Sequence, residues 1–143
     1  MLNDVEMLNC ILQNAEMGCQ GVADVRKNIS SERSVDKLLR EQLTRYGKIY
    51  RVAAGMLHSR GAEINHISPV SRKLSEFTAK RDLKRDCSAS HVAEMMIKGN
   101  TMGVNKLAHS MRKYDRSDSN ITLLAKKLLD TEEEHIREMR AFL

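Results

Sequence analysis

Glu132 and His135 are the residues of this sequence whose types and spacing are best suited to metal chemistry. A separation of three positions places both side chains close together on one side of a helix. Glu132 falls near the middle of an apolar stripe, and His135 falls on its flank. Because a carboxylate among aliphatic side chains is costly unless it is protonated, hydrogen-bonded or bound to a cation, we expect the protein to supply a partner for Glu132.

The helix that carries this pair is expected to follow a polar turn at residues 115–119 and to reach Leu143. Its inward face is marked by apolar residues at three- and four-residue spacing, which is typical of an amphipathic helix. These residues are Ile121, Leu124, Ala125, Leu128, Ile136, Met139 and Leu143.

Length and periodicity indicate one all-α domain, residues 1–143. A chain of 143 residues can bury a single core without disulfide or metal staples. Leucine, methionine, alanine, lysine and glutamate recur at helical spacing, whereas glycine and the single proline fall at a few points. This pattern predicts helices throughout the chain.

The composition narrows the functional classes. Three cysteines without metal-type spacing favour reduced thiols in a cytoplasmic protein over a disulfide framework. The first residues lack the pattern of a signal peptide, and no segment approaches the ~20 apolar residues of a membrane span, so no membrane partner is expected. A net charge of +5 spread along helical faces, with 3% aromatic residues, argues against nucleic-acid binding.

Four long helices are predicted, at about residues 3–28, 32–60, 88–114 and 119–143, and Gly61 is expected to end the second. Their inward positions follow the same spacing rule as the last helix. In the first three long helices these positions are Val5, Leu8, Ile11, Leu12, Ala15, Cys19 and Val22; Val35, Leu38, Leu39, Gln42, Tyr46, Ile49, Ala53 and Leu57; and Ala93, Met96, Ile97, Asn100, Val104, Leu107 and Met111.

The connection at residues 61–88 is much longer than the usual link between neighbouring helices. Within it, Ser68–Pro69 suits the cap and first turn of a short helix that carries Val70, Leu74 and Phe77. Such a segment can cross the whole bundle. The expected topology is therefore two antiparallel hairpins joined by one long crossover.

Polar residues stand close to the midpoint of every long helix, and we expect them to form one layer in the interior. The members of this interior polar layer are Glu16, Gln42, Tyr46, Asn100, Glu132 and His135.

This arrangement resembles the ferritin-like superfamily of di-iron carboxylate proteins. In that family a Glu from each of two helices and a Glu-x-x-His motif from each of the other two surround a metal pair. The resemblance implies a ferritin-like four-helix bundle, in which Glu132 and His135 match the fourth-helix motif and Glu16 is the first-helix carboxylate. It makes Glu16, Glu132 and His135 the candidate metal ligands, with iron or manganese as the metal.

The second and third long helices depart from the family pattern. Gln42 stands where the Glu of a Glu-x-x-His motif is expected, with Arg45 three residues on, and Asn100 occupies the ligand position of the third. Two carboxylates and one histidine leave two metal cations with too little negative charge around them.

Three interpretations of the interior are open. Glu132 can accept hydrogen bonds from Tyr46, Gln42 and Asn100, with His135 as a further partner, without any metal. Alternatively, the three candidate ligands can hold a single metal ion, or the site can work as a di-iron oxidase or peroxidase. We adopt the first, which assigns no catalytic residue and no cofactor. It predicts a non-catalytic binding or assembly protein; the alternatives are a metal-dependent oxidoreductase or storage protein, and a nucleic-acid-binding relative of ferritin.

A stripe of methionine and histidine is expected to face outward and to form an interface. Met17, Met95 and Met102 point away from the predicted core, with His91 and His109 beside them. Methionine adapts well to binding surfaces, and an exposed apolar patch on a globular protein indicates a partner. A homo-oligomer, in particular a homodimer, or a helical protein partner is therefore expected.

Basic residues gather in two places, on the crossover helix and at the end of the third long helix. We interpret both clusters as solvated faces with cations near helix C-termini, rather than as nucleic-acid sites. They comprise Lys80, Arg81, Lys84 and Arg85, and Arg112, Lys113 and Arg116.

Overall fold

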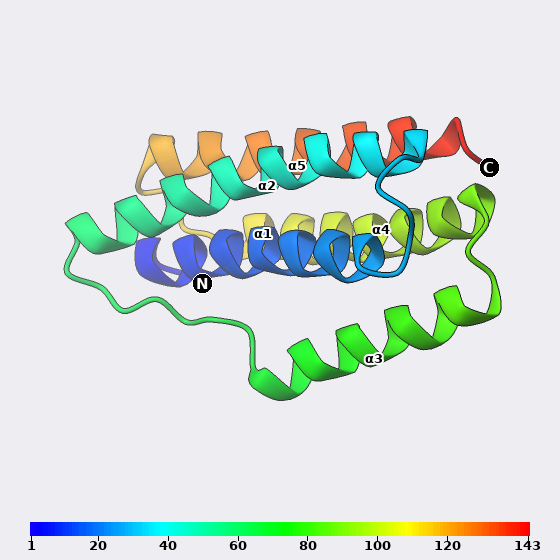
Figure 1. The fold of residues 1–143 in the computed structure, drawn as a ribbon. Coiled ribbons are helices and arrows are strands. Elements are labelled where there is room, and N and C mark those ends of the chain that lie inside the picture. The colour runs from blue at the N-terminus through cyan, green and yellow to red at the C-terminus, as the bar shows by residue number, and fades with distance from the viewer.

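The computed structural model covers residues 1–143 and contains five α-helices and no β-strand (Figure 1). The prediction of an all-α protein is confirmed. None of the five helices combines the length and the apolar composition that a membrane crossing requires. The helices are α1 (Asp4–Arg26), α2 (Ser34–Ser59), α3 (Pro69–Arg85), α4 (Ala89–Lys113) and α5 (Ser119–Arg140).

Side-chain caps fix the starts of four helices. Asn3 and Glu6 form a reciprocal capping box at the start of α1, in which each side chain accepts from the other residue's backbone N–H. Ser68, Ser88 and Asp118 each accept a backbone N–H at the starts of α3, α4 and α5. The cap that the sequence predicts at Ser68 is thus used in the structure.

The four long helices form two antiparallel hairpins, α1 with α2 and α4 with α5 (Figure 1). Across the bundle α1 contacts α4, and α2 contacts α5. The C-terminus of α2 and the N-terminus of α4 lie at opposite ends of the bundle, and α3 with its flanking loops connects them (Figure 1). The crossover therefore runs along the outside of the bundle, where α3 packs against α1.

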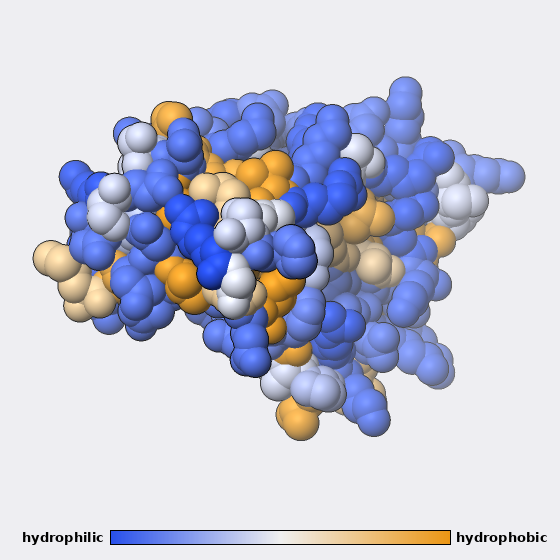
Figure 2. Space-filling view, turned by 90° about the vertical axis from the view of Figure 1, so that its left-hand side faces the viewer, coloured by the Kyte–Doolittle hydropathy of each residue, from blue (hydrophilic) through white to orange (hydrophobic).

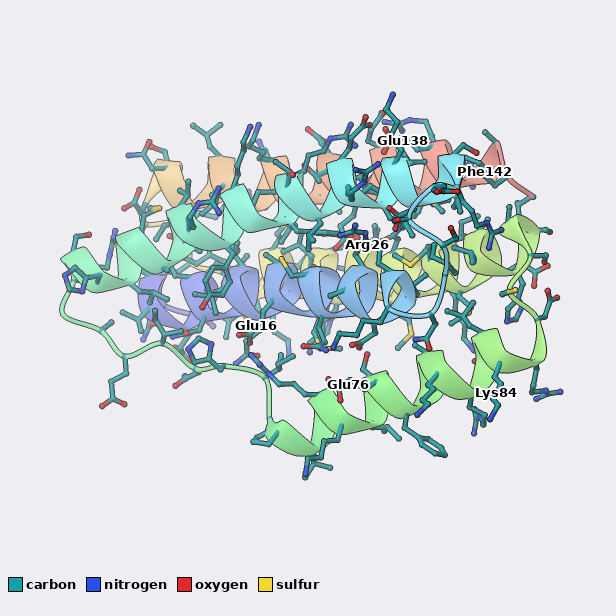
Figure 3. The ribbon with its side chains drawn as sticks, in the orientation of Figure 1. Glu16, Arg26, Glu76, Lys84, Glu138 and Phe142 are labelled. Atoms are coloured by element: carbon teal, nitrogen blue, oxygen red, sulfur yellow. The ribbon has the colours of Figure 1, made fainter.

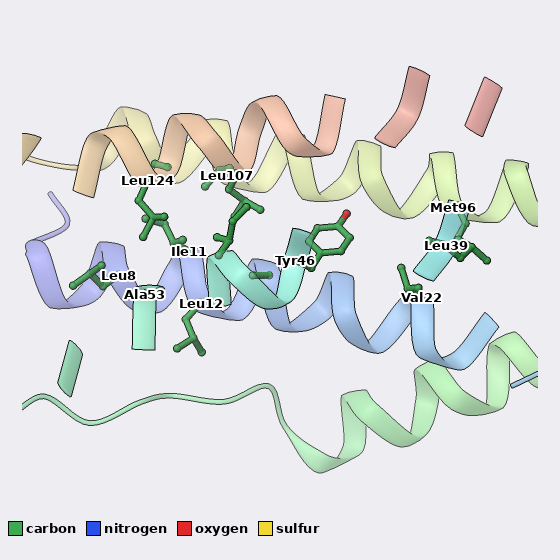
Figure 4. Packing of buried hydrophobic residues seen from close by; sticks show 14 of the residues in the cluster. Leu8, Ile11, Leu12, Val22, Leu39, Tyr46, Ala53, Met96, Leu107 and Leu124 are labelled. Carbon is green, nitrogen blue, oxygen red and sulfur yellow. The ribbon is translucent and has the colours of Figure 1, made fainter. Parts of the chain in front are cut away.

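The core lies between the four long helices and consists of 24 buried hydrophobic residues, some of which are drawn in Figure 4. Most predicted inward positions are buried or pack against this cluster. Leu143 is an exception, because α5 ends at Arg140 and the Leu143 side chain is exposed. The expectation that the last helix reaches Leu143 with an inward side chain is therefore corrected.

Helix α3 differs from the other four, since it buries only Ala79 and Leu83. Its larger apolar residues Val70, Leu74 and Phe77 are exposed. Figure 2 looks at the end of the bundle where α2 finishes, and it shows hydrophobic atoms at the lowest edge, where α3 lies. The crossover helix is thus attached to the bundle without contributing much to its hydrophobic core.

Candidate functional site

The hydroxyl of Tyr46 lies at the centre of the interior, 2.7 Å from Oε2 of Glu132 and 2.9 Å from Oδ1 of Asn100. A phenol has one hydrogen, so it donates to the nearer carboxylate. Oδ1 of Asn100 is a second acceptor for the phenol, whereas Nδ2 of the same amide has no partner, so the expected hydrogen bond from Asn100 to Glu132 is not formed. Hydrogen bonds in this way join α2, α4 and α5.

Two glycines make room for these groups. A Cβ atom on Gly18 of α1 would lie 2.5 Å from Cε1 of Tyr46, and one on Gly103 of α4 would lie 2.9 Å from Oε1 of Glu132. The ring of Tyr46 lies among the buried core residues between the helices (Figure 4). The backbones of α1 and α4 therefore form part of the wall of the site.

The Glu132 side chain is only 2% exposed. Burial raises the pKa of this carboxyl to about 7, against the opposing effect of the hydrogen bond from Tyr46. Burial, together with the negative charge of Glu132, also raises the pKa of the Tyr46 phenol far above its usual range. At neutral pH the phenol is a permanent donor, whereas Glu132 exchanges between its protonated and ionised forms.

His135 is fully buried and packs edge-on against Tyr46, with ring centroids 4.8 Å apart and an angle of 81° between the ring planes. Neither ring nitrogen has a hydrogen-bond partner, so the expected hydrogen bond between His135 and Glu132 is not formed. Burial, and secondarily the positive charge of Arg45, lower the pKa of His135 to about 4. The imidazole is therefore neutral at physiological pH.

Gln42 is fully buried, but it contacts Glu138 rather than Glu132. Its Nε2 donates to Oε1 of Glu138 at 3.3 Å, and Arg45 donates to the same oxygen at 2.7 Å. The expected hydrogen bond from Gln42 to Glu132 is thus not formed. The physical reason is that the carboxylate of Glu138, also held by Arg45, competes for the amide.

Asn14 of α1, which is not among the predicted members of the layer, is buried beside α4. Its Nδ2 donates to the carbonyl oxygen of Gly103 at 3.0 Å. Its Oδ1 has no donor and, like Oε1 of Glu132, lies over Gly103. Two oxygen acceptors, one from Asn14 and one from Glu132, therefore lie over the same glycine.

Glu16 does not belong to the interior polar layer. Its carboxylate accepts the backbone N–H of Ile67 at 2.6 Å and contacts Nδ1 of His66 at 2.7 Å and Arg72 at 3.1 Å. Figure 3 shows Glu16 on the side of α1 that faces the crossover. The prediction that placed Glu16 beside Glu132 is corrected, because its position at the edge of the apolar stripe directs it outward.

The three candidate metal ligands are consequently not brought together. The structure contains no group of three or more His, Cys, Asp or Glu side chains arranged to hold a metal ion. Glu132 and His135 lie in the layer, while Glu16 is bonded to the crossover. The donor to Glu132 is the phenol of Tyr46, which carries no charge.

The predicted methionine and histidine stripe is only partly exposed. Met17 and Met102 are 44% and 66% exposed, and His109 is also exposed. Met95, in contrast, packs against the core, and Nε2 of His91 is buried without a partner. The exposed part of this stripe is therefore smaller than the sequence predicts.

Comparisons of the chain with protein-family models, with curated proteins and with solved structures found no match. The functional assignment accordingly rests on the residues of the chain and their geometry.

Proposed function

We propose that this protein is a ferritin-like four-helix bundle that works without catalysis, by binding a protein partner through its helix faces. In this proposal the interior corresponds to the metal position of ferritin-like proteins but is a degenerate metal site. The order of the helices and the long crossover between two antiparallel hairpins support the ferritin-like assignment.

The observation that carries the proposal is the 2.7 Å hydrogen bond from Tyr46 to Glu132. A carboxylate that binds a metal directs its oxygens at the cation, but here one oxygen of Glu132 is occupied by a phenol donor. The other candidate carboxylate, Glu16, is held by the crossover. The remaining charge is too small to neutralise two cations in a buried site.

Metal analysis of the untagged protein tests this proposal. We expect iron and manganese to be far below stoichiometric amounts in both the wild-type protein and Glu132→Gln. We also expect the variant to remain folded, because glutamine keeps an oxygen for the Tyr46 hydroxyl. Glu134→Gln, at an exposed position on the same helix, is the matched control. Stoichiometric metal that disappears only in Glu132→Gln would contradict the proposal.

One observation favours a second candidate, a metal-dependent oxidoreductase. His135 stands three residues from Glu132 with both ring nitrogens unpartnered, and a buried neutral imidazole is a good ligand. This candidate predicts Fe(II) oxidation with multiple turnovers under air, abolished by His135→Phe. A rate equal to that of the buffer would remove it.

A further inference from the structure

The larger apolar residues of α3 face solvent, whereas those of the four long helices mostly face the core. Val70, Leu74 and Phe77 recur at four- and three-residue spacing, which places them on one face of the helix, and they are 77%, 63% and 61% exposed. The apolar residues that α3 buries are instead Ala79 and Leu83, and the helix packs against α1. Apolar side chains in such a row on an exposed face indicate a surface that a partner covers.

Polar contacts on the opposite side hold α3 in this orientation. Arg72 pairs with Glu16 at 3.1 Å, and the hydroxyl of Ser75 donates to Asp24 at 2.7 Å. Both acceptors on α1 are buried, so turning the apolar residues inward would leave two buried carboxylates without these donors. The outward direction of the apolar row is therefore built into the attachment.

The same face becomes basic towards the C-terminus of α3. Five exposed cations lie within about 90° of the centre of the apolar row at ~100° per residue. The two acidic residues of the helix, Glu76 and Asp82, lie roughly 120° away from it by the same rule. Glu76 is directed towards α1, where it pairs with Lys27 at 3.5 Å (Figure 3). The cations are Lys73, Lys80, Arg81, Lys84 and Arg85.

Most of this positive charge is free to pair with a ligand. Arg81 contacts Asp82 at 3.3 Å and lies over the ring of Phe77 at 5.8 Å. The other four cations of the face form no ion pair within the chain. We define the α3 outer face as the apolar row together with these five cations, with the apolar part in the N-terminal half and most of the charge in the C-terminal half.

The separation of apolar and basic parts along the axis selects the kind of partner. A helix that lies on a bilayer needs apolar residues along its whole length, with cations at the sides. A polynucleotide would pair its phosphates with the cations and leave the apolar row uncovered. A partner helix with apolar side chains at one end and carboxylates at the other matches both halves.

We propose that the α3 outer face is the docking surface for an acidic amphipathic helix of a partner protein. Leu74 and Phe77 contact its apolar side chains, and Lys80 and Lys84 pair with its carboxylates. The apolar row spans about 10 Å and the basic part about 8 Å at 1.5 Å per residue, and the whole face measures about 22 Å, which corresponds to about four turns of the partner. This assignment deepens the proposed function, on which it rests.

Two synthetic helical peptides of identical composition, each about 20 residues long, provide the probe. One has leucine and phenylalanine on one face of its first half and glutamate on the same face of its second half; the other alternates them along the whole face. We expect the full-length protein to bind the segregated peptide about tenfold more tightly than the alternating one in a fluorescence-anisotropy titration. Raising the salt from about 0.05 M to about 0.5 M should weaken this binding.

Variants at exposed positions locate the contact. Phe77→Ser and the pair Lys80→Glu with Lys84→Glu should each weaken binding of the segregated peptide about tenfold or more. Leu123→Ser on α5 is the matched control for the first, because Leu123 is 62% exposed and lies outside α3. The pair Lys126→Glu with Lys127→Glu, also on α5, is the control for the second. Circular dichroism checks that all four proteins remain folded.

Several results would overturn the assignment. Equal binding of the two peptides, no binding, or binding that survives both α3 variants would each do so. Preferential binding to phosphatidylserine vesicles or to a DNA duplex would name a different occupant, as would a homodimer that Phe77→Ser dissociates. None of these results alters the metal content, so failure of the docking surface is distinguishable from failure of the proposed non-metal interior.

Discussion

Two buried carboxylates, Glu16 on α1 and Glu132 on α5, are 7% and 2% exposed and have entirely different partners. Glu16 accepts a backbone N–H and faces the cationic side chain of Arg72, with His66 on the same oxygen. Glu132 has one neutral donor, the hydroxyl of Tyr46. The two sites differ in the charge of the partners. Glu16 contacts a cationic side chain of the crossover, whereas Glu132 contacts no cation.

This difference assigns the two residues different roles. A carboxylate that contacts a cationic side chain and accepts a backbone N–H fixes a segment in place, and Glu16 fixes the crossover against α1. A carboxylate with only a neutral donor in a dry interior is costly when ionised, so its protonation state follows the pH. The role of a buried carboxylate therefore depends on its hydrogen-bond donors as well as on its burial.

The largest expected loss of stability comes from filling the space that the Tyr46 ring occupies. Gly18→Ala would place a methyl group about 2.5 Å from the buried ring, and we expect this overpacking to destabilise the protein by about 3 kcal/mol. The displaced phenol would no longer donate to Glu132. Gly21→Ala on the same helix has open space around the new methyl group and should stabilise by up to about 1 kcal/mol. Urea denaturation measures both, and equal stabilities would contradict the packing described.

Glu132→Gln should stabilise the protein at alkaline pH. The folded pKa of Glu132 is raised from 4.5 to about 7, so the stability connected with this group is full below pH 4.5 and is lost as the pH rises through 7. At pH 8 the variant should be more stable than wild type by up to about 3 kcal/mol, from a shift of about 2.5 units at 1.36 kcal/mol each. Denaturation at a series of pH values checks whether the difference vanishes near pH 4.5.

The same variant should also expose the titration of His135. Its folded pKa is lowered from 6.5 to about 4, so its contribution is present above pH 6.5 and is lost as the pH falls through 4. In wild type the opposite slope from Glu132 offsets much of this loss. Glu132→Gln should therefore lose about 3 kcal/mol between pH 6.5 and 4, a larger loss than wild type shows. Adding His135→Phe should remove the extra slope, and an unchanged slope would contradict the assignment.

Glu16→Gln should have the smallest effect on global stability. The side chains of His66 and Arg72 are about half exposed, so water replaces part of the lost interaction and the cost should be about 1 kcal/mol. Hydrogen exchange at the backbone N–H of Ile67 is the sharper measurement, because glutamine accepts that hydrogen bond more weakly. Glu63→Gln, at an exposed position of the same loop, is the control. Unchanged protection of Ile67 would contradict the role given to Glu16.

The sequence predicted the parts of the site that depend on helical periodicity. Tyr46, Asn100 and Glu132 stand at inward phases of three helices, and the structure brings their polar atoms together. Glu16 could not be placed in the same way. It stands at the edge of a stripe, where a small rotation of α1 decides its direction, and its partners come from a long crossover that periodicity does not position.

Other features of the site depend on distances that a sequence does not contain. Glycine is uncommon in helix interiors, where it costs about 1 kcal/mol relative to alanine. The presence of Gly18 and Gly103 in two helices is therefore the signal in the sequence for a close approach of a neighbouring side chain. Which side chain fills the space follows only from the packing. The opposite pKa shifts of Glu132 and His135 likewise require burial and neighbours to be known.

The hydrogen bonds of Tyr46 cross from one hairpin to the other, since Tyr46 is in the first and Glu132 and Asn100 are in the second. Contacts between leucine, isoleucine and valine can re-form when one helix shifts along another. The Tyr46 hydroxyl, in contrast, finds its acceptors at one axial position only. If one hairpin shifted by one helical turn, about 5.4 Å, the hydroxyl would lie among methyl groups without an acceptor. The contact therefore sets the axial register of the two hairpins, and separately produced hairpins would reassemble in that register only.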